Sequence, residues 1–597
     1  MTPCDARVTP GDAPEPGPNH STRRETIPDP HAPPGSWTSL PGMMLGLAVR
    51  NPDRPMIRHW SGGAWKTTTW RDFATAVASV AAGLRARGVS PGDRVALVSD
   101  SRPEFLIADT ALMAVGAVTV PTYTTNTVAD HAHILRDSGA RAAIASSARL
   151  ATRLREAAGP DGLDLLICME DAPGAVSWPD LIATPGDLAM LVAEVAQIPE
   201  GRLACLIYTS GTGGTPKGVM LPHRAMLANR AGVLPLIQQL GLEWSGACYL
   251  SFLPLSHAYE HTVGGSLLLS YGIEIVFSRG ADRIAAEFQE IEPALVTAVP
   301  RLFEVLRGRI LAGLEKEKPW KRALFDRAVA LGLRRMDGPP LNILERIQDA
   351  ALDRLVRAKV RARFGHKLEV IVSGGARLDP DLSGFFLALG INVLQGYGQT
   401  EAGPVIAVNL PWDNRRRTVG LPVKGVEARI APDGELLVRG GLVMDGYWGD
   451  QAATARTLAI PPGETEPWLH TGDVGEIDAT GRLTITDRKK DFIKTLGGDM
   501  VSPARIEGLL MAEPEIAQAV VAGEGRPGVV ALVVPAEGAN AEKAIQRING
   551  KLSGTERIRK WAVVDPFTVE NGLLTPTMKV KRRFVIERHA AAIENLY

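Results

Sequence analysis

Short apolar, β-branched runs alternate with helix-like segments along most of the chain, and this alternation limits the fold more than any other feature. Apolar residues recur at helical spacing over residues 70–88, which end on a glycine suited to a helix C-cap. Residues 91–101 predict a turn and a buried strand, and residues 104–121 predict a helix and then a strand. The same alternation returns in SGARAAIAS, EIVFS, ALVTAVP and KLEVIVSGG. This pattern is typical of α/β layers with largely parallel strands.

The length of the chain predicts more than one domain. With 597 residues it exceeds what one ordinary hydrophobic core holds. Residues 1–36 are rich in proline and poor in large apolar side chains, so we expect a disordered tail there. Near Val419 the pattern changes to short strands and Pro/Gly/Asp turns, as in a small β-rich subdomain. The charged run DRKKDF then lies between two strand-like segments, so we predict domains over residues 37–486 and 493–597.

Charge, cysteine content and hydropathy exclude several classes of protein. Lys plus Arg and Asp plus Glu both number 66, so the global basic field that would collect nucleic acid is absent, although local patches stay open. The four cysteines lie far apart without a C-x-x-C pair, which excludes a disulfide framework and an ordinary zinc knuckle. We find neither a membrane-spanning apolar run nor a signal-peptide pattern, and therefore expect a cytoplasmic protein.

The strongest local signal is the glycine-rich stretch at residues 206–221, LIYTSGTGGTPKGVML. A strand-like run enters a loop with three glycines and four hydroxyl side chains, followed by Pro216 and Lys217. Glycines let the backbone approach a ligand, hydroxyls donate hydrogen bonds and the lysine supplies charge, which together suit a polyphosphate. It is no Walker A loop, because proline precedes Lys217 and glycine follows it. A flexible surface loop is the alternative interpretation.

A second cluster, QGYGQTEA at residues 395–402, follows the apolar INVL. Its glycines flank polar groups at what resembles a strand end, where α/β folds bind ligands. Tyr397 is suited to stack on a base, Thr400 to bind phosphate, and Glu401 to hold Mg²⁺, which favours carboxylate oxygen. From composition alone, a tight turn with an exposed acid fits equally well.

Two further clusters lie nearer the C-terminus. In WLHTGDVGEIDATGRLTITDRKK, we expect Asp473 in a turn, where it would accept hydrogen bonds from a ribose diol, and Arg488 to pair with the ribose or a phosphate. A solvated hairpin with a charged linker is the alternative. In TPTMKVKRR, Lys579 and Lys581 share one side if the segment is extended, although a basic tail is the simpler interpretation.

Taken in this order, the four clusters resemble those of the acyl-adenylate-forming (AMP-binding) superfamily, and most of all its long-chain fatty-acyl-CoA synthetase branch. The resemblance runs from about residue 37 to the C-terminus, and only Gly213 departs from the loop pattern, which usually has threonine. SGGA at residues 373–376 is similar to the strand end beside the adenine, and LPLSHAYE at 253–260 to the segment lining the acyl channel. TPTMKVKRR resembles the motif of the catalytic lysine.

The resemblance implies a large layered α/β N-terminal domain with a β-rich subdomain, and a small mobile α+β C-terminal domain. It implies that a carboxylate attacks ATP-Mg²⁺ to form acyl-AMP, and that coenzyme A then takes the acyl group. Catalytic roles fall to Lys579, Glu401, Thr400, Lys217 and His257, with Glu401 as the metal ligand. Nucleotide and coenzyme A contacts fall to Thr209, Ser210, Gly211, Thr212, Gly213, Gly214, Lys217, Gly374, Gly375, Ala376, Gly396, Tyr397, Gly398, Gln399, Thr400, Asp473, Arg488, Lys490, Gly497 and Gly498.

The resemblance also implies a hinge at residues 487–492, with Lys490 at the pivot, about which the C-terminal domain rotates between half-reactions. A fatty acid is the favoured substrate, because residues 299–332 resemble a helical insertion of the long-chain ligases. Two hypotheses stay beside it: an adenylating ligase for another acid or a carrier-protein phosphopantetheine, and a noncatalytic nucleotide-binding protein. The last is disfavoured by the presence of all five residues expected of a catalyst, Lys217, Glu401, Asp473, Arg488 and Lys579. Contact with the inner face of the membrane and the oligomeric state stay open.

Overall fold

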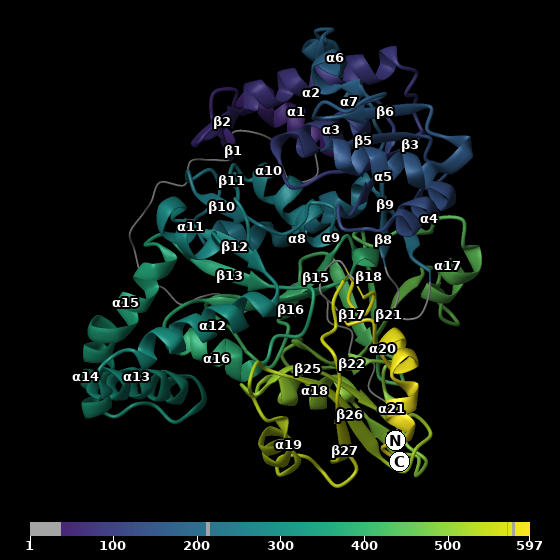
Figure 1. The fold of residues 1–597 in the computed structure, drawn as a ribbon. Coiled ribbons are helices and arrows are strands. Elements are labelled where there is room, and N and C mark those ends of the chain that lie inside the picture. The colour runs from purple at the N-terminus through teal and green to yellow at the C-terminus, as the bar shows by residue number, and fades with distance from the viewer. Residues whose placement is uncertain (1–36, 210–214, 570, 576–579) are drawn as a thin grey trace. The chain divides into compact units, whose positions relative to one another are not determined.

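The computed structural model describes residues 37–209, 215–569, 571–575 and 580–597, and divides into two compact units. The first contains the described parts of Met1–Thr209, with Lys217–Ala428 and Val438–Leu469. The second contains the described parts of Ser210–Pro216, with Arg429–Leu437 and His470–Tyr597. We describe each unit by itself (Figure 1).

An eight-stranded sheet in the first unit has the order β19-β9-β8-β4-β3-β5-β6-β7. Its strands are β3 Arg94–Val98, β4 Val118–Thr122, β5 Ala142–Ala145, β6 Leu165–Cys168, β7 Val176–Ser177, β8 Leu203–Thr209, β9 Lys217–Pro222 and β19 Gly446–Tyr447. The six strands β8, β4, β3, β5, β6 and β7 run parallel to one another in this order. Strands β9 and β19 are antiparallel to their neighbours. The accompanying helices are α1 Leu40–Arg50, α2 Trp70–Ala86, α3 Pro103–Ala114, α4 Val128–Ser138, α5 Ala148–Ala158, α6 Trp178–Ile182 and α7 Leu188–Val195.

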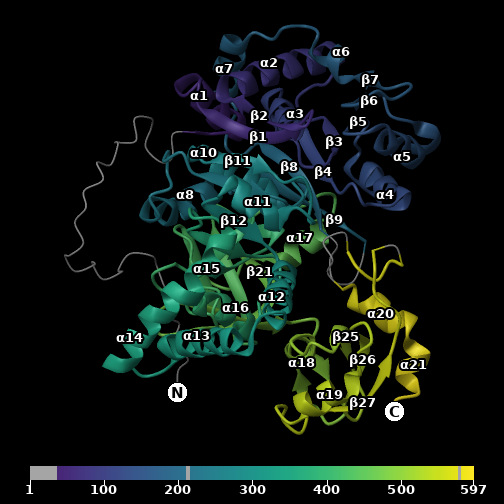
Figure 2. The same cartoon turned by 60° about the vertical axis from the view of Figure 1, so that its left-hand side comes forward.

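A nine-stranded sheet in the same unit has the order β16-β15-β14-β13-β12-β10-β11-β1-β2. Its strands are β1 Pro55–Ser61, β2 Ala64–Thr69, β10 Cys248–Ser251, β11 Glu274–Phe277, β12 Leu295–Ala298, β13 Val370–Ser373, β14 Val393–Gly398, β15 Val405–Val408 and β16 Leu421–Pro422. The accompanying helices are α8 His223–Gln239, α9 Ala258–Thr262, α10 Leu268–Ser270, α11 Ile284–Ile291, α12 Pro300–Glu315, α13 Pro319–Asp337, α14 Ile343–Leu352, α15 Ala358–Arg361 and α16 Pro380–Ala388. Helices α11, α12 and α16 are labelled in Figure 2. Their phenylalanines form part of the core on this sheet.

A third sheet, ordered β17-β18-β21-β20 with β22 on β21, contains three of the points at which the chain passes between the units, at residues 428–429, 437–438 and 469–470. Its strands are β17 Val426–Ile430, β18 Glu435–Gly440, β20 Leu458–Ala459, β21 Trp468–Ile477 and β22 Leu483–Arg488, and helix α17 Gln451–Thr457 precedes β20.

The second unit has a three-stranded sheet, ordered β25-β26-β27, with apolar clusters on both faces. Its remaining elements are β23 Ile493–Lys494, β24 Met500–Val501, α18 Pro503–Met511, β25 Ile516–Ala522, β26 Val529–Pro535, α19 Ala541–Asn549, β27 Ile558–Val563, α20 Arg582–Arg588 and α21 Ala590–Glu594. Because alternate residues of β25 and β26 face opposite sides, one face packs on α18 and α19 and the other on α20 and α21.

The predicted alternation of strands and helices is confirmed. Helix α2 begins at a capping box formed by Thr69 and Asp72. It ends in a Schellman motif, in which Gly88 N–H donates to Arg85 O and Val89 N–H donates to Leu84 O. Gly88 has a φ of +86°, which explains the glycine at this position. The helical insertion predicted over residues 299–332 corresponds to α12 and most of α13.

Two local predictions are wrong. Asp473 does not lie in a turn, because strand β21 runs through it to Ile477 and pairs it with Arg488 of β22. The strand accommodates Gly472, with a φ of +71°, as a local distortion. Strand β22 also extends two residues into the charged run, which the sequence analysis places wholly between strands.

Candidate active site

The glycine-rich loop joins two antiparallel strands, β8 and β9. Thr209 and Lys217 lie opposite each other in this pair, so the strands bring the two ends of the loop together. The predicted contacts Ser210, Gly211, Thr212, Gly213 and Gly214 lie outside the described residues. Buried residues of β8 anchor the N-terminal side of the loop.

Lys217, at the start of β9, is held by two partners that the sequence analysis missed. Its Nζ lies 2.8 Å from an Asp450 carboxylate oxygen and 5.3 Å from the centroid of the Tyr447 ring. The hydrogen bond from Lys217 lowers the pKa of Asp450, and the N–H of Ala453 acts in the same direction. Asp450 also caps helix α17 through that N–H, which fixes the carboxylate in place.

Glu401 lies directly after β14, in the helical turn Thr400–Ala402. The hydroxyl of Tyr447 donates a 2.8 Å hydrogen bond to Glu401 Oε1. Tyr447 belongs to β19, which pairs with β9, and therefore reaches Lys217 with its ring and Glu401 with its hydroxyl. The structure thus joins Lys217, which follows the glycine-rich loop, and the QGYGQTEA cluster through one tyrosine.

Strand β14 contains Gly396, Tyr397 and Gly398, and Gln399 follows it. Gly398 needs its lack of a side chain, because an added Cβ would lie 1.9 Å from the carbonyl oxygen of Pro404. The parallel strands β13 and β14 pair Ser373 with Gln395. Their carboxyl ends therefore meet at one edge of the sheet, as predicted for a ligand site in an α/β fold.

Gly374, Gly375 and Ala376 follow β13 at that edge. An added Cβ on Gly374 would lie 2.9 Å from the ring of Tyr259, and Gly375 has a φ of +77°. The Tyr259 hydroxyl donates to Val372 O at 3.2 Å. His257 caps helix α9 by accepting the N–H of Tyr259 on Nδ1 at 3.1 Å. Tyr259 therefore connects His257 with the glycines after β13.

Asp473 and Arg488 form an ion pair in the second unit, with 3.2 Å between Arg488 Nε and Asp473 Oδ1. The Asp473 side chain is 5% exposed and that of Arg488 48%, so the arginine orients a carboxylate that is otherwise buried. Because both residues belong to paired strands, their geometry does not depend on a loop. The alternative of a fully solvated hairpin does not hold for Asp473.

Lys490 is exposed in the turn after β22, and Gly497 and Gly498 lie in the turn between β23 and β24. Gly498 has a φ of +87°, which favours glycine. Asp487, at the start of the charged run, is buried and accepts hydrogen bonds from Ser502 Oγ and from the N–H of Arg488. Lys579 lies outside the described residues.

The surroundings of Glu401 fit a magnesium ion bound together with nucleotide phosphates. Mg²⁺ is usually held by one or two carboxylates and completes its shell with phosphate oxygens and water. Tyr447 holds Oε1, and the side chain of Glu401 is partly exposed. Among the described residues, no group of three or more His, Cys, Asp and Glu side chains is placed to hold a metal ion.

Comparison with known proteins decides the family. Residues 47–448, more than half of the chain, match the profile of the AMP-binding enzyme family. The chain belongs to the AMP-binding enzyme family. Residues 490–597 match the AMP-binding enzyme C-terminal domain.

Relatives match this family member almost end to end. It is 34% identical over 606 residues to the long-chain-fatty-acid–CoA ligase FadD15 of Mycobacterium bovis, with 94% of this chain and 98% of the relative covered. It is 28% identical to the peroxisomal long chain acyl-CoA synthetase 7 of Arabidopsis thaliana, with 90% of this chain and 82% of the relative covered. The resemblance to the long-chain synthetase branch is thereby confirmed.

Solved structures establish the fold. The O-succinylbenzoate coenzyme A synthetase of Bacillus subtilis, in complex with ATP and magnesium ion, has a TM-score of 0.69 at 20% identity and covers 91% of this chain and 98% of its own. The anthranilate CoA ligase AuaEII has a TM-score of 0.71 at 21% identity and covers 94% and 98%. The predicted fold class, that of the adenylate-forming enzymes, is confirmed.

Proposed function

We propose that this AMP-binding enzyme is an AMP-forming fatty-acid–CoA ligase whose acid substrate is a long-chain fatty acid. In the first half-reaction the carboxylate attacks the α-phosphate of ATP, pyrophosphate leaves and acyl-AMP forms. In the second, the thiol of coenzyme A attacks the acyl carbonyl and AMP leaves. The end-to-end match with FadD15, a protein named long-chain-fatty-acid–CoA ligase, carries this proposal.

Within the first unit, we assign the neutralisation of phosphate charge to Lys217 and Glu401. Lys217 donates to phosphate oxygens, and Asp450 keeps its ammonium oriented when no nucleotide is bound. Glu401 holds Mg²⁺, which supplies positive charge to the triphosphate when bound. The Tyr447 hydroxyl orients the Glu401 carboxylate. Tyr397 stacks on the adenine, and Thr209 and Thr400 donate hydroxyl hydrogen bonds to phosphates.

Within the second unit, we assign the ribose hydroxyls to Asp473, with Arg488 holding its carboxylate. Lys490 serves as the pivot of a hinge at residues 487–492, between domains over residues 37–486 and 493–597. Gly497 and Gly498 permit close approach of the pantetheine chain. The loop residues 210–214 and Lys579 keep the roles that the family resemblance implies.

A different acid is the second candidate. The solved structures of the same fold include an O-succinylbenzoate and an anthranilate ligase. The alignment with long-chain ligases favours the fatty acid, because it covers nearly all of both chains.

An assay of pyrophosphate and AMP release over saturated acids from four to twenty carbons, with and without coenzyme A, tests the proposal. We expect acyl-CoA from long-chain acids only when coenzyme A is present. Aryl acids as the preferred substrates, or adenylation without thioester formation, would refute it.

The variant Lys579→Ala tests the two half-reactions separately. This variant should lose acyl-AMP formation yet convert supplied acyl-AMP to acyl-CoA at nearly the wild-type rate. Lys581→Ala, a neighbouring lysine without an assigned role, is the matched control. Equal loss of both half-reactions in Lys579→Ala would contradict the role assigned to that lysine.

A further inference from the structure

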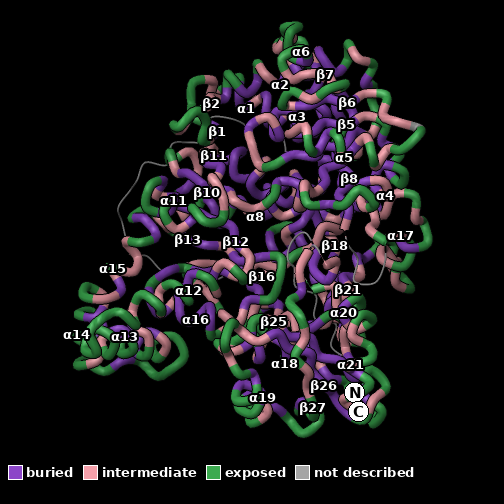
Figure 3. Tube along the Cα trace, viewed as in Figure 1, coloured by how far each residue is buried: buried purple, intermediate pink, exposed green. Residues whose placement is uncertain are grey.

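Helix α14 exposes large apolar side chains to solvent. Ile343, Leu344 and Ile347 are 77%, 79% and 64% exposed, and Leu355, in the wide helical turn after α14, is 56% exposed. Figure 3 shows most of α14 in the colour of exposed residues. A soluble helix normally turns such residues inward, so this face points to a partner.

The exposed residues form one stripe on the helix. Ile343, Ile347 and Ala351 are spaced four residues apart, and Leu344 and Leu355 adjoin them at helical spacing. The opposite side of the helix is buried, since Leu352 packs with Ala328 and Leu331 of α13. Helix α14 therefore has two apolar sides, one packed in the core and one exposed to solvent.

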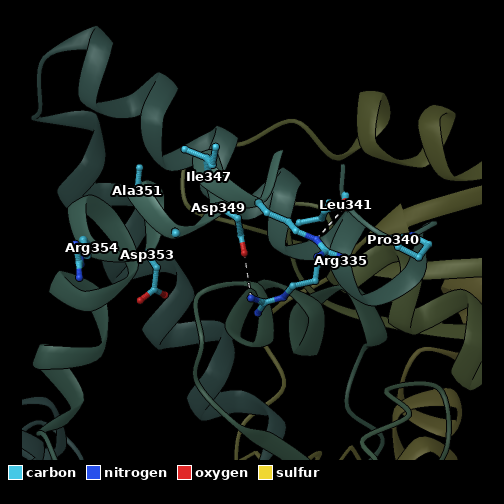
Figure 4. A pocket seen from close by; sticks show the side chains of 10 residues that line it. Arg335, Pro340, Leu341, Ile347, Asp349, Ala351, Asp353 and Arg354 are labelled. Carbon is cyan, nitrogen blue, oxygen red and sulfur yellow. Dashed lines mark hydrogen bonds and ion pairs between the residues drawn. The ribbon is translucent and has the colours of Figure 1, made fainter. Parts of the chain in front are cut away.

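Arginines border the stripe. Arg346 and Arg354 lie beside it and line, with Arg335, a hollow of about 900 Å³. Figure 4 shows Arg335 directed toward Asp349. Their ion pair has 3.1 Å between Nη1 and Oδ2. The carboxylates near the hollow are already paired with arginines, Asp349 with Arg335 and Arg357 and Asp353 with Arg361. Among the described residues, neither Arg346 nor Arg354 forms an ion pair.

The surrounding segment is basic, although the whole chain is neutral. Residues 319–363 contain 11 Lys and Arg against five Asp and Glu, a local net charge of +6. Arg346 donates a hydrogen bond to the backbone oxygen of Leu341, which leaves its charge without a carboxylate partner. Aliphatic side chains bordered by such arginines are typical of an interfacial helix on an anionic lipid surface. Within the described residues, no helix combines the length and hydropathy needed to cross a bilayer.

We propose that the stripe formed by Ile343, Leu344, Ile347 and Leu355 inserts into the headgroup region of an anionic membrane, with Arg346 and Arg354 on lipid phosphates. A second copy of the chain is the weaker occupant. Four aliphatic side chains offer far less than the roughly 800 Å² per partner that a stable protein interface buries. The inference rests on the proposed function for its purpose, because a long-chain acid partitions into bilayers.

Co-sedimentation of the full chain with vesicles tests this docking surface without any turnover. We expect binding to phosphatidylglycerol-containing vesicles, little binding to pure phosphatidylcholine, and weakening in high salt. The double variant I343S/I347S should lower the partition coefficient roughly 100-fold. Arg354→Gln should lower it about fivefold.

Matched controls are V49S/M190S, which removes two exposed apolar side chains of α1 and α7, and Arg149→Gln on α5. Absence of vesicle binding, or equal loss in the controls, would overturn the proposal. A change in sedimentation coefficient of I343S/I347S without lipid would assign the face to a second copy. Acyl-CoA formation from octanoate without vesicles should be unchanged in I343S/I347S, so the ligase assignment stands or falls separately.

Discussion

Glu260 gives the sharpest test of the electrostatics. Its side chain, on α9, is fully buried against the neighbouring strands β10 and β12, where it accepts hydrogen bonds from the hydroxyls of Tyr249, Ser251 and Thr297 at 2.5–3.0 Å. No described cation forms an ion pair with it. Burial raises the pKa of Glu260 to about 7, although the three hydroxyl hydrogen bonds act in the opposite direction.

The sign of the pH effect follows from this raised pKa. Between pH 4.5 and about 7 the folded protein holds a proton that the unfolded chain has released. The stability associated with the neutral carboxyl is therefore complete below pH 4.5 and is lost as the pH rises through 7. A shift of this size corresponds to about 3 kcal/mol of unfolding free energy.

Glu260→Gln should remove this dependence, because an amide of the same shape does not ionise. We expect the unfolding free energy of the variant minus that of the wild type to rise by about 3 kcal/mol between pH 4.5 and pH 8. Urea denaturation followed by tryptophan fluorescence at several pH values measures this difference. Asp282→Asn, which removes a carboxylate with an 81% exposed side chain in the same unit, is the control. If the difference in unfolding free energy between Glu260→Gln and the wild type did not change with pH, or fell as the pH rose, the raised pKa of Glu260 would be refuted.

Two predictions concern the nucleotide. Tyr447→Phe removes the hydrogen bond to Glu401 and should lower kcat/KM for ATP-Mg²⁺ about tenfold in a pyrophosphate-release assay. The control is Tyr597→Phe in the second unit, which loses a hydroxyl hydrogen bond to Gly528 O and should keep its kcat/KM. An unchanged Tyr447→Phe enzyme would exclude orientation of Glu401 by this hydroxyl. Asp473→Asn should raise KM for ATP roughly 10–100-fold, because a charged acceptor for the ribose is lost, and Asp433→Asn, an exposed acid paired with Lys489, is its control. Equal KM values in these two variants would remove Asp473 from the ribose site.

Sequence periodicity predicts the layers because it is local. The runs SGARAAIAS, EIVFS, ALVTAVP and KLEVIVSGG become the mostly buried strands β5, β11, β12 and β13, and residues 70–88 become a capped helix. Sheet order is different, because it depends on pairings over long separations. Strand β1 pairs with β11 more than 200 residues later, and no local pattern records this pairing.

The error at Asp473 shows how tertiary context overrides turn propensity. Threonine, glycine and aspartate in HTGD favour a turn by local chemistry. Alternating burial along β21 and the pairing of Asp473 with Arg488 instead keep the segment in a strand. Asp473 does lie beside Arg488, and its role at the ribose stays a prediction, whereas the turn predicted for its backbone is wrong.

Tyr447 and Asp450 show what the motifs alone leave out. Both lie in GYWGD, a stretch whose only regular structure is the two-residue strand β19. They reach Lys217 because β19 pairs with β9, and a pairing so short and so distant has no periodic signal in the sequence. A tyrosine between glycine and tryptophan is the single local hint, and many surface turns share it.

The position of Tyr447 also allows the contributions of Lys217 and Glu401 to be separated. Its ring faces the Lys217 ammonium, while its hydroxyl reaches Glu401. Replacement by phenylalanine keeps the ring and its attraction for the cation but deletes the donor to the carboxylate. A loss confined to magnesium dependence would therefore report on Glu401 alone, and Tyr447→Leu would add the effect of removing the ring from Lys217. If both variants were equally impaired, removal of the ring would add nothing to the loss of the hydroxyl, and the ring would have no separate role at Lys217. If only Tyr447→Leu were impaired, the tyrosine would serve only to place the lysine.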